Sequence, residues 1–236
     1  MFGSLGALVV AAAVGLVIWS QVGVMAAEPG PLAAVRADPA IAITDHDAGI
    51  VLAPAGQSSS VGLVFIPGAK VDPWAYASIL SGVVERDDVT VVITKPWLNL
   101  AFFDPRALGT FTDLAPGIDT WMVGGHSLGG VRACQLATDA DALVLFGSYC
   151  ANDLSGSGLS VLSIAGSEDG LSTPEKISEA RHLLPENARL VEIAGASHAS
   201  FGDYGPQSGD GTPTISDADM QSKVTELVGE LATSLG

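Results

Sequence analysis

Short apolar runs alternate with helix-like segments along most of this chain. Runs such as Val61–Ile66 and Ala142–Phe146 contain no polar side chain, which is typical of strands buried on both faces. Strand–helix–strand connections of this kind join parallel strands, so the pattern predicts an α/β fold with a doubly wound, mostly parallel sheet. We expect strands at residues 40–44, 50–53, 61–66, 89–94, 120–124, 142–146, 159–165 and 189–193, and helices at 73–84, 104–114, 128–138, 174–184 and 216–231.

The N-terminal 27 residues differ from the rest of the chain in being almost entirely apolar. In the apolar run from Leu5 to Ala27 only Ser20 and Gln21 are polar, and a helix needs about 20 apolar residues to span a bilayer. A cleaved signal peptide, with its cleavage site at residues 24–26, is the alternative. Either reading places the remainder outside the cytoplasm, membrane-anchored or secreted. We therefore divide the chain into an anchor or signal segment (1–27), a proline-rich linker (28–39) and one domain (40–236).

Charge and cysteine content exclude several classes of function. The formal net charge is −16, from 26 acidic and 10 basic residues, and such a surface repels nucleic acids and anionic lipids. The two cysteines, Cys134 and Cys150, lack the spacing of a metal site. A bridge between them is geometrically possible, but we expect two buried free thiols. Asp45, His46 and Asp47 are interpreted as the tip of a hairpin and not as metal ligands.

A candidate nucleophile lies between an expected strand and an expected helix. Residues 125–129 read Gly-His-Ser-Leu-Gly, and in a strand–turn–helix this pattern forms a nucleophile elbow. The turn is so tight that glycine must flank it, and it lifts the serine hydroxyl above the edge of the sheet. Ser127 is therefore the expected nucleophile. A passive serine in a glycine-rich turn is the alternative.

The candidate base follows by elimination among four histidines. His46 precedes the nucleophile, whereas the base of such a site follows it in the chain. His126 adjoins the serine, so its side chain points elsewhere, and His182 lies on an expected helix. His198 follows the last expected strand in a loop of small residues, where an imidazole can reach the site.

The candidate acid follows the strand expected at residues 159–165. A carboxylate just past the C-terminal end of a parallel strand lies at the same sheet edge as Ser127. Asp169 is preferred to its neighbour Glu168, because the shorter side chain beside Gly170 suits a fixed turn. Its expected task is to orient His198 and stabilise the imidazolium.

The remaining site residues lie in three loops. The N–H groups of Leu128 and Ala69 are expected to form the oxyanion hole. Candidate substrate-binding residues are Lys70, Asn99, Tyr204 and Gln207. Lys70 has the alternative of a solvated loop lysine, and the loop at 201–211 either rims the site or orders the chain before the last helix.

Five motifs together resemble the bacterial α/β-hydrolase group related to dienelactone hydrolases, in a serine-nucleophile, esterase-like branch. They are FIPGAKVDP (65–73), KPWLNLA (95–101), GGHSLGG (124–130), GSEDGL (166–171) and SHASFGDYGPQ (197–207). The resemblance implies a minimal α/β-hydrolase fold without a cap domain, a triad of Ser127, Asp169 and His198, esterase-type activity and no cofactor. It also favours an uncleaved N-terminal helix. The sequence departs from the pattern of this group at two positions. Dienelactone hydrolases proper use a cysteine nucleophile where this chain has Ser127, and Ser197 stands where asparagine is expected before the base.

The sequence thus predicts a serine hydrolase that cleaves small carboxylic esters through an acyl-serine. An acyltransferase or peroxidase-like variant would use the same serine, and a non-catalytic binding module could retain the scaffold. The connection at residues 147–158 is too short for a lid domain, which favours an open site and acyl groups of about two to six carbons. No metal, cofactor or nucleic-acid partner is expected, and the sequence leaves the oligomeric state open.

Overall fold

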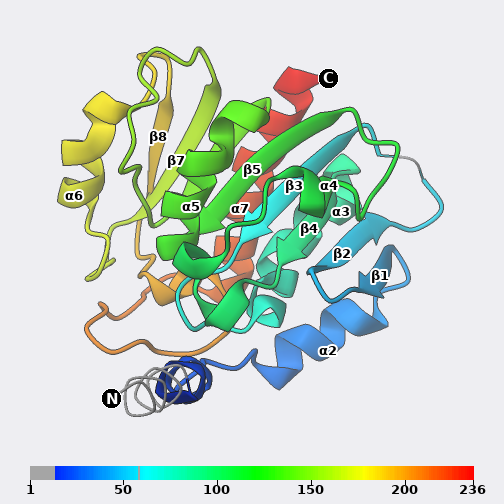
Figure 1. Ribbon diagram of the computed structural model, residues 1–236, viewed down its shortest axis with the longest axis horizontal. Coiled ribbons are helices and arrows are strands. Elements are labelled where there is room, and N and C mark those ends of the chain that lie inside the picture. Colours follow the sequence, from blue (N-terminus) through cyan, green and yellow to red (C-terminus); the bar gives the residue numbers. More distant parts are fainter. Residues whose placement is uncertain (1–13, 58) are drawn as a thin grey trace, which may run out of the picture.

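The computed structural model describes residues 14–57 and 59–236. Its centre is an eight-stranded sheet in the order β1-β2-β4-β3-β5-β6-β7-β8 (Figure 1). The strands are β1 (Ile41–Asp45), β2 (Gly49–Pro54), β3 (Val61–Ile66), β4 (Thr90–Thr94), β5 (Thr120–His126), β6 (Ala142–Phe146), β7 (Ser160–Gly166) and β8 (Arg189–Ile193). β1 and β2 form an antiparallel hairpin, β2 pairs antiparallel with β4, and all other pairs are parallel. The predicted mostly parallel α/β sheet is therefore confirmed.

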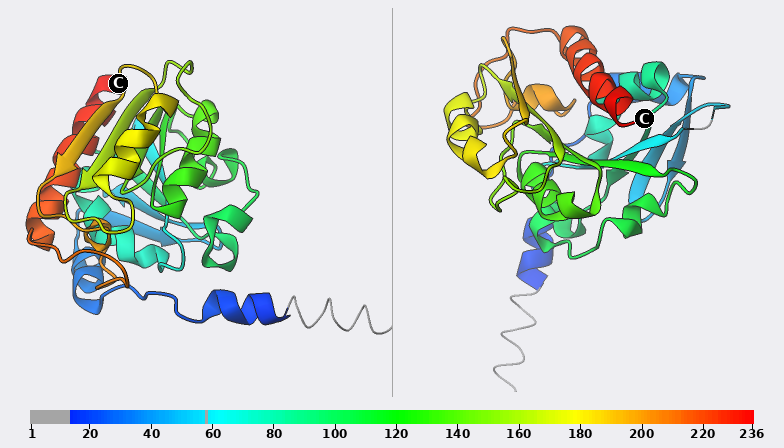
Figure 2. Two further views of the ribbon diagram at one scale, coloured as in Figure 1. Left: turned by 90° about the vertical axis from the view of Figure 1, so that its left-hand side faces the viewer. Right: turned by 90° about the horizontal axis from the view of Figure 1, so that it is seen from above.

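Helices cover both faces of the sheet (Figure 2). They are α2 (Pro29–Ala37), α3 (Ala77–Asp87), α4 (Gly109–Thr112), α5 (Leu128–Leu136), α6 (Pro174–Glu179) and α7 (Asp217–Leu235). α3 and α7 pack against each other on one face, and α5 lies on the other. Short 3-10 helices occur at 73–76, 97–99, 101–103, 137–139, 180–183 and 199–201. The two faces enclose two separate apolar clusters, so each central strand is buried on both sides.

Polar side chains fix where several helices begin. The Asp72 carboxylate accepts a hydrogen bond from Trp74 N at 3.0 Å, so the chain turns into the 3-10 helix that leads to α3. Thr173 caps α6 in the same way, and Ser216 caps α7. These side chains satisfy N–H groups that a helix leaves without partners in its first turn.

Parallel pairing brings the ends of six strands, β3 to β8, to one edge of the sheet. Ile66 of β3 pairs with Gly125 of β5, and His126 pairs with Phe146 of β6. The register continues to the ends of β7 and β8. The loops after these strands therefore meet, as the carboxyl ends of parallel strands do in open α/β sheets.

Two segments differ from their expected structure. The helix expected at residues 104–114 is reduced to α4, because the Asp104 carboxylate pairs with the Arg106 guanidinium and Arg106 also donates to Lys95 O. Residues 28–39, expected to be a linker, instead contain α2. This helix packs against α3 and buries Val35.

The N-terminal segment is only partly described. Residues 14–21 are helical, and residues 1–13 of the expected anchor or signal segment lie outside the described part of the chain. No helix within 14–57 and 59–236 is both long and apolar enough to cross a membrane.

Cys134 and Cys150 form a disulfide, so the expectation of two free thiols is wrong. α5 starts directly at the end of β5 and runs back beside β6, which places Cys134 next to the loop that follows β6. The Cα atoms of the two cysteines are 5.5 Å apart, and Asn152 Nδ2 also donates to Cys134 O at 3.1 Å. The bridge thus fastens α5 to the β6–β7 connection.

Reduction of this disulfide is expected to lower the free energy of unfolding. The two cysteines are 16 residues apart, and closing a loop of this length stabilises a fold by about 3 kcal/mol through the entropy of the unfolded chain. Urea unfolding of the protein with and without dithiothreitol measures the difference. The Cys134→Ser/Cys150→Ser variant is the control, because reductant should not change its unfolding midpoint. Equal midpoints for the oxidised and reduced wild-type protein would contradict the prediction.

Candidate active site

Ser127 occupies a strained turn between β5 and α5. Its backbone has φ 51° and ψ −123°, a conformation that side-chain-bearing residues rarely adopt. Ser127 N donates to Phe146 O at 3.1 Å, and Ser148 Oγ donates to Ser127 O at 2.7 Å. The neighbouring strand and its loop therefore hold the turn on both sides of the serine.

The glycines flanking the serine are required by close backbone contacts. A Cβ at Gly129 would lie 2.0 Å from Ile66 O, and one at Gly125 would lie 2.4 Å from the carbonyl carbon of Gly129. Both distances are far below van der Waals contact. The start of α5 can therefore approach the loop after β3 only because these positions lack side chains.

His198 and Asp169 form a buried pair. His198 Nδ1 lies 2.8 Å from Asp169 Oδ2, and both side chains are almost fully buried. Asp169 Oδ1 accepts the N–H groups of Leu171 and Ser172 at 2.8 and 2.7 Å. These two bonds hold the carboxyl group so that Oδ2 faces His198, and an N–H at Nδ1 that donates to Oδ2 leaves Nε2 as the acceptor atom of the ring. Glu168, the alternative acid, is exposed instead and contacts Ser167 Oγ.

Gly147 brings the serine turn next to this pair. It follows Phe146, the partner of Ser127 N, and has φ 47°. A Cβ at this position would lie 2.9 Å from Asp169 Oδ2 and 3.2 Å from His198 Nδ1. Gly147 therefore packs against the Asp169–His198 pair, while the residue before it, Phe146, accepts the Ser127 N–H.

The expected oxyanion hole combines the N–H of Ala69, in the loop after β3, with that of Leu128 at the start of α5. Gly68 N donates to Tyr76 Oη at 2.9 Å, and Lys70 N donates to Asn99 O at 2.8 Å. The N–H groups of Ala69 and Leu128 form no hydrogen bond with any residue of the described chain. Bonds on either side thus fix the loop and leave the Ala69 N–H available for an oxyanion.

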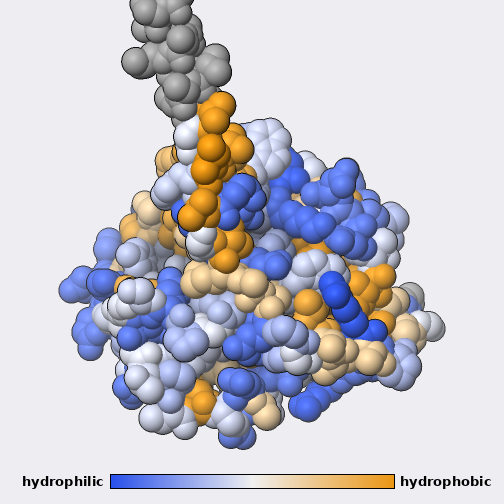
Figure 3. All heavy atoms as spheres, turned by 90° about the horizontal axis from the view of Figure 1, so that it is seen from below, coloured by the Kyte–Doolittle hydropathy of each residue, from blue (hydrophilic) through white to orange (hydrophobic). Residues whose placement is uncertain are grey.

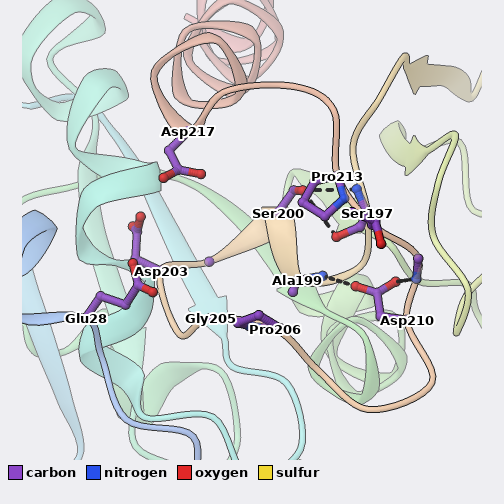
Figure 4. Close-up of a pocket in the computed structure, with 13 residues that line it drawn as sticks. Glu28, Ser197, Ala199, Ser200, Asp203, Gly205, Pro206, Asp210, Pro213 and Asp217 are labelled. Carbon is purple, nitrogen blue, oxygen red and sulfur yellow. Dashed lines mark hydrogen bonds between the residues drawn. The ribbon is translucent and has the colours of Figure 1, made fainter.

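Asp210 links the loops of the acid and the base, and sequence reasoning did not identify it. Its Oδ1 accepts Gly170 N at 3.1 Å and His198 N at 3.0 Å. Its Oδ2 accepts Ala199 N at 2.8 Å, the bond drawn between these two residues in Figure 4. Burial opposes ionisation of this carboxyl, but these bonds outweigh it and lower the pKa of Asp210. No local motif marks this residue, which lies 12 positions beyond His198.

His126 and Tyr76 connect the base to the loop after β3. Tyr76 Oη lies 2.9 Å from His126 Nδ1 and accepts the Gly68 N–H, so it joins the two residues by hydrogen bonds. The His126 and His198 rings lie 4.4 Å apart between centroids. Burial lowers the pKa of His126 well below its usual value, and protonation of the nearby His198 lowers it further, so His126 stays neutral. Its expected orientation away from the site was wrong, because the buried ring packs against His198.

A cavity of about 250 Å³ lies beside the loop that carries His198. Figure 4 shows Glu28, Asp203 and Asp217 on one side of it, facing Ser200 and Asp210 on the other. Burial raises the pKa of Asp203 to about 6, and the nearby Asp217 and Glu28 carboxylates contribute. Ser127 does not line this acidic cavity, so it is separate from the expected nucleophile.

Lys70 and Asn99 contact the N-terminal segment rather than an open pocket. Lys70 Nζ donates to Trp19 O at 2.9 Å and to Val22 O at 3.2 Å, and it lies 3.7 Å from the centre of the Trp19 ring. Asn99 Nδ2 donates to Ser20 O at 3.2 Å. Both candidate substrate-binding side chains thus bind carbonyl groups at the C-terminal end of the helix at residues 14–21, where cations and donors are favoured.

Tyr204 and Gln207 contact each other at the edge of the site. Tyr204 is buried, and its ring packs against Tyr76 and His126 at centroid distances of 6.5 and 6.2 Å. Its hydroxyl donates to Gln207 Oε1 at 3.1 Å. In this position Tyr204 supports His126 from within the core, which agrees with the alternative that this loop orders the chain.

A model of the alpha/beta hydrolase family matches residues 62–222, which cover the sheet from β3 to β8 and all the loops described above. The chain belongs to the alpha/beta hydrolase family. The family predicted from the motifs is therefore confirmed. No curated protein sequence matches the chain.

Solved structures of this alpha/beta hydrolase fold include several esterases. Esterase 2 of Thermogutta terrifontis, phosphoramylated by tabun, is 15% identical with a TM-score of 0.57, covering 84% of this chain and 96% of that one. The esterase domain of a Rhodothermus marinus protein is 14% identical with a TM-score of 0.61, covering 83% and 98%. A dienelactone hydrolase-like promiscuous phosphotriesterase from metagenomic libraries is 15% identical with a TM-score of 0.53, covering 83% and 96%. At these identities the likeness is one of fold.

Replacing Asp210 with asparagine is expected to lower kcat for a small activated ester more than it raises KM. The amide cannot accept all the N–H groups that the carboxylate accepts, so the His198 loop shifts, and small displacements of this kind cost on the order of tenfold to a hundredfold in rate. Steady-state kinetics with p-nitrophenyl acetate measure both constants.

The lowered pKa of Asp210 also makes the free energy of unfolding depend on pH. The stabilisation from the Asp210 carboxylate should be present above its pKa in the unfolded chain, about 3.9, and should be lost as the pH falls through its lower pKa in the folded protein.

The matched control is Asp153→Asn. Asp153 also accepts a backbone N–H, that of Ser155 at 2.9 Å, but does so in an exposed loop. It should leave both constants unchanged. If Asp210→Asn behaves like this control, Asp210 does not position the base.

Proposed function

We propose that this protein is a serine hydrolase that cleaves small carboxylic esters, with Ser127 as nucleophile, His198 as base and Asp169 as acid. The observation that carries the proposal is the buried His198–Asp169 pair, 2.8 Å between Nδ1 and Oδ2, beside the strained turn of Ser127. Membership of the alpha/beta hydrolase family and the esterases among its structural neighbours support it.

The proposed reaction follows from the protonation states of these groups. His198 Nε2 takes the proton of Ser127 Oγ while the oxygen attacks the acyl carbon, and Asp169 stabilises the imidazolium. The N–H groups of Leu128 and Ala69 bind the carbonyl oxygen as it becomes negative. His198 then gives the proton to the departing alcohol, which leaves an acyl-serine. Water, activated by the same imidazole, attacks the acyl-serine, releases the carboxylic acid and restores Ser127.

We further propose that the domain lies outside the cytoplasm and is anchored by the apolar run at residues 5–27. The Cys134–Cys150 disulfide supports an oxidising compartment. Retention of the segment is supported by its contacts, because Met25 N donates to Lys70 O at 2.7 Å and Asp72 N donates to Met25 O at 2.9 Å. Cleavage near residues 24–26 would remove buried Ser20 and break this pairing.

Ser127→Ala is expected to abolish both ester hydrolysis and labelling by a fluorophosphonate probe. Loss of the nucleophile from a catalytic triad lowers kcat by about a millionfold, because its members act as a unit. The circular dichroism spectrum should remain that of the folded protein. Labelling is read by fluorescence after denaturing electrophoresis. Ser157→Ala, at an exposed serine of the β6–β7 connection, is the control and should label fully. Persistent labelling of Ser127→Ala would refute the nucleophile.

A matched pair of carboxylate variants tests the acid in the same assay. Asp169→Asn removes the acceptor of the His198 Nδ1 proton, and a change of this kind costs about 10⁴-fold in kcat. Glu168→Gln alters an exposed neighbour and should have little effect. The reverse order would assign the acid to Glu168.

Acyl-chain preference is expected to favour groups of about two to six carbons. Residues 147–159 between β6 and β7 contain neither helix nor strand, so this connection holds no lid domain of the kind that encloses long acyl chains. Each methylene left in water forgoes about 0.8 kcal/mol of burial energy. A series of p-nitrophenyl esters measures kcat/KM against chain length. A maximum at about ten carbons or longer would indicate a hydrophobic tunnel and contradict the expectation.

A further inference from the structure

Exposed apolar side chains are concentrated in two segments of the described chain. Of the eleven large apolar side chains exposed among the residues that the structure describes, nine lie at 14–22 or 97–103. The first segment contributes Val14, Leu16, Val17, Ile18, Trp19 and Val22. Figure 3 shows these side chains as a hydrophobic column that stands out from the domain. The second segment contributes Trp97, Phe102 and Phe103, with Phe102 75% exposed.

Direct hydrogen bonds hold the two segments together. Asn99, in the middle of the second segment, donates to Ser20 O at 3.2 Å and accepts Lys70 N at 2.8 Å. Lys70 Nζ in turn binds Trp19 O and Val22 O. These hydrogen bonds fix the main chain at residue 99 next to the C-terminal end of the helix, so the exposed apolar side chains of the two segments belong to neighbouring parts of the surface. We call these two parts together the apolar rim.

The composition of both segments points to a lipid occupant. Neither residues 5–27 nor residues 97–103 contain a charged side chain, although the protein has 36 charged residues in all. The apolar helix leads back into the run that begins at Leu5, so a bilayer that accepts this run lies next to the rim. Tryptophan and phenylalanine are residues that enter the boundary between headgroups and acyl chains.

We propose that the apolar rim is a second membrane contact, in which Trp97, Phe102 and Phe103 insert into the surface of a zwitterionic bilayer beside the N-terminal helix. This inference rests on the anchoring proposed above. The net charge of −16 disfavours anionic lipid. Lys70 directly follows Ala69 of the expected oxyanion hole, so the contact holds the Ser127 edge of the sheet close to the lipid headgroups.

A fluorescent label on the rim tests the proposal in the full chain. Both native cysteines are in the disulfide, so Phe102→Cys supplies a single free thiol for an environment-sensitive nitrobenzoxadiazole label. The protein is reconstituted into phosphatidylcholine vesicles with or without nitroxide-labelled lipid. The label should shift to shorter wavelength and lose most of its emission to the nitroxide lipid. Leu190→Cys on β8, an exposed apolar position outside the rim, should show neither effect.

Flotation of the vesicles separates the two proposals. Absence of co-flotation overturns the anchoring and the rim contact together. Co-flotation with an unquenched label at residue 102 overturns the rim contact alone. A shift that grows with protein concentration without quenching by lipid would assign the rim to a second copy of the chain and also overturns the proposal.

Removal of the side-chain hydrogen bonds between the two segments provides a further check of the rim contact. Lys70→Ala/Asn99→Ala removes the side-chain bonds to residues 19–22 while the apolar residues remain. In the Phe102→Cys background it should reduce quenching without reducing flotation. Unchanged quenching would show that these bonds do not set the orientation, and would overturn this part of the proposal.

Discussion

The close approach of α5 to the end of β3 determines the geometry of the site. Gly129 lies where any side chain would overlap Ile66 O, so the helix that begins at Leu128 starts in contact with the loop that contains Ala69. The same approach forces the chain at Ser127 into a positive-φ turn, which a hydrogen bond to Phe146 O holds in place. Backbone strain of this kind persists only where surrounding contacts over-determine it. The serine and two N–H groups are thereby positioned before any substrate is present.

Two acidic side chains hold His198 and its loop in place. Asp169 binds the imidazole of His198, whereas Asp210 binds the main chain at His198 and Ala199 and the main chain of the acid's own turn at Gly170. Because one carboxylate accepts hydrogen bonds from both loops, the loops after β7 and β8 form a single unit. His126 adds a neutral ring beside His198 and continues through Tyr76 to Gly68. The base and the expected oxyanion loop are therefore connected through the interior.

The N-terminal segment is part of this arrangement and not an appendage to it. Its main chain pairs with Val71, and its carbonyl groups at residues 19–22 accept hydrogen bonds from Lys70 and Asn99. Helix α2 then packs on α3. A disulfide on the opposite face of the sheet fastens α5, so both flanks of the Ser127 turn are restrained by contacts between distant parts of the chain.

The sequence by itself determined the strands, the mostly parallel α/β class of the sheet and the turn between β5 and α5, because each follows from residue patterns within a few positions of one another. The same local reasoning selected His198 and Asp169, which the structure brings to 2.8 Å. Only the tertiary structure decided the roles of Asp210, Tyr76 and His126, the pairing of the cysteines, and the binding of Lys70 and Asn99 to the N-terminal helix. The physical reason is sequence separation: these contacts join residues between 8 and 79 positions apart. Their existence depends on how strands and helices pack, which no local pattern of residue types encodes.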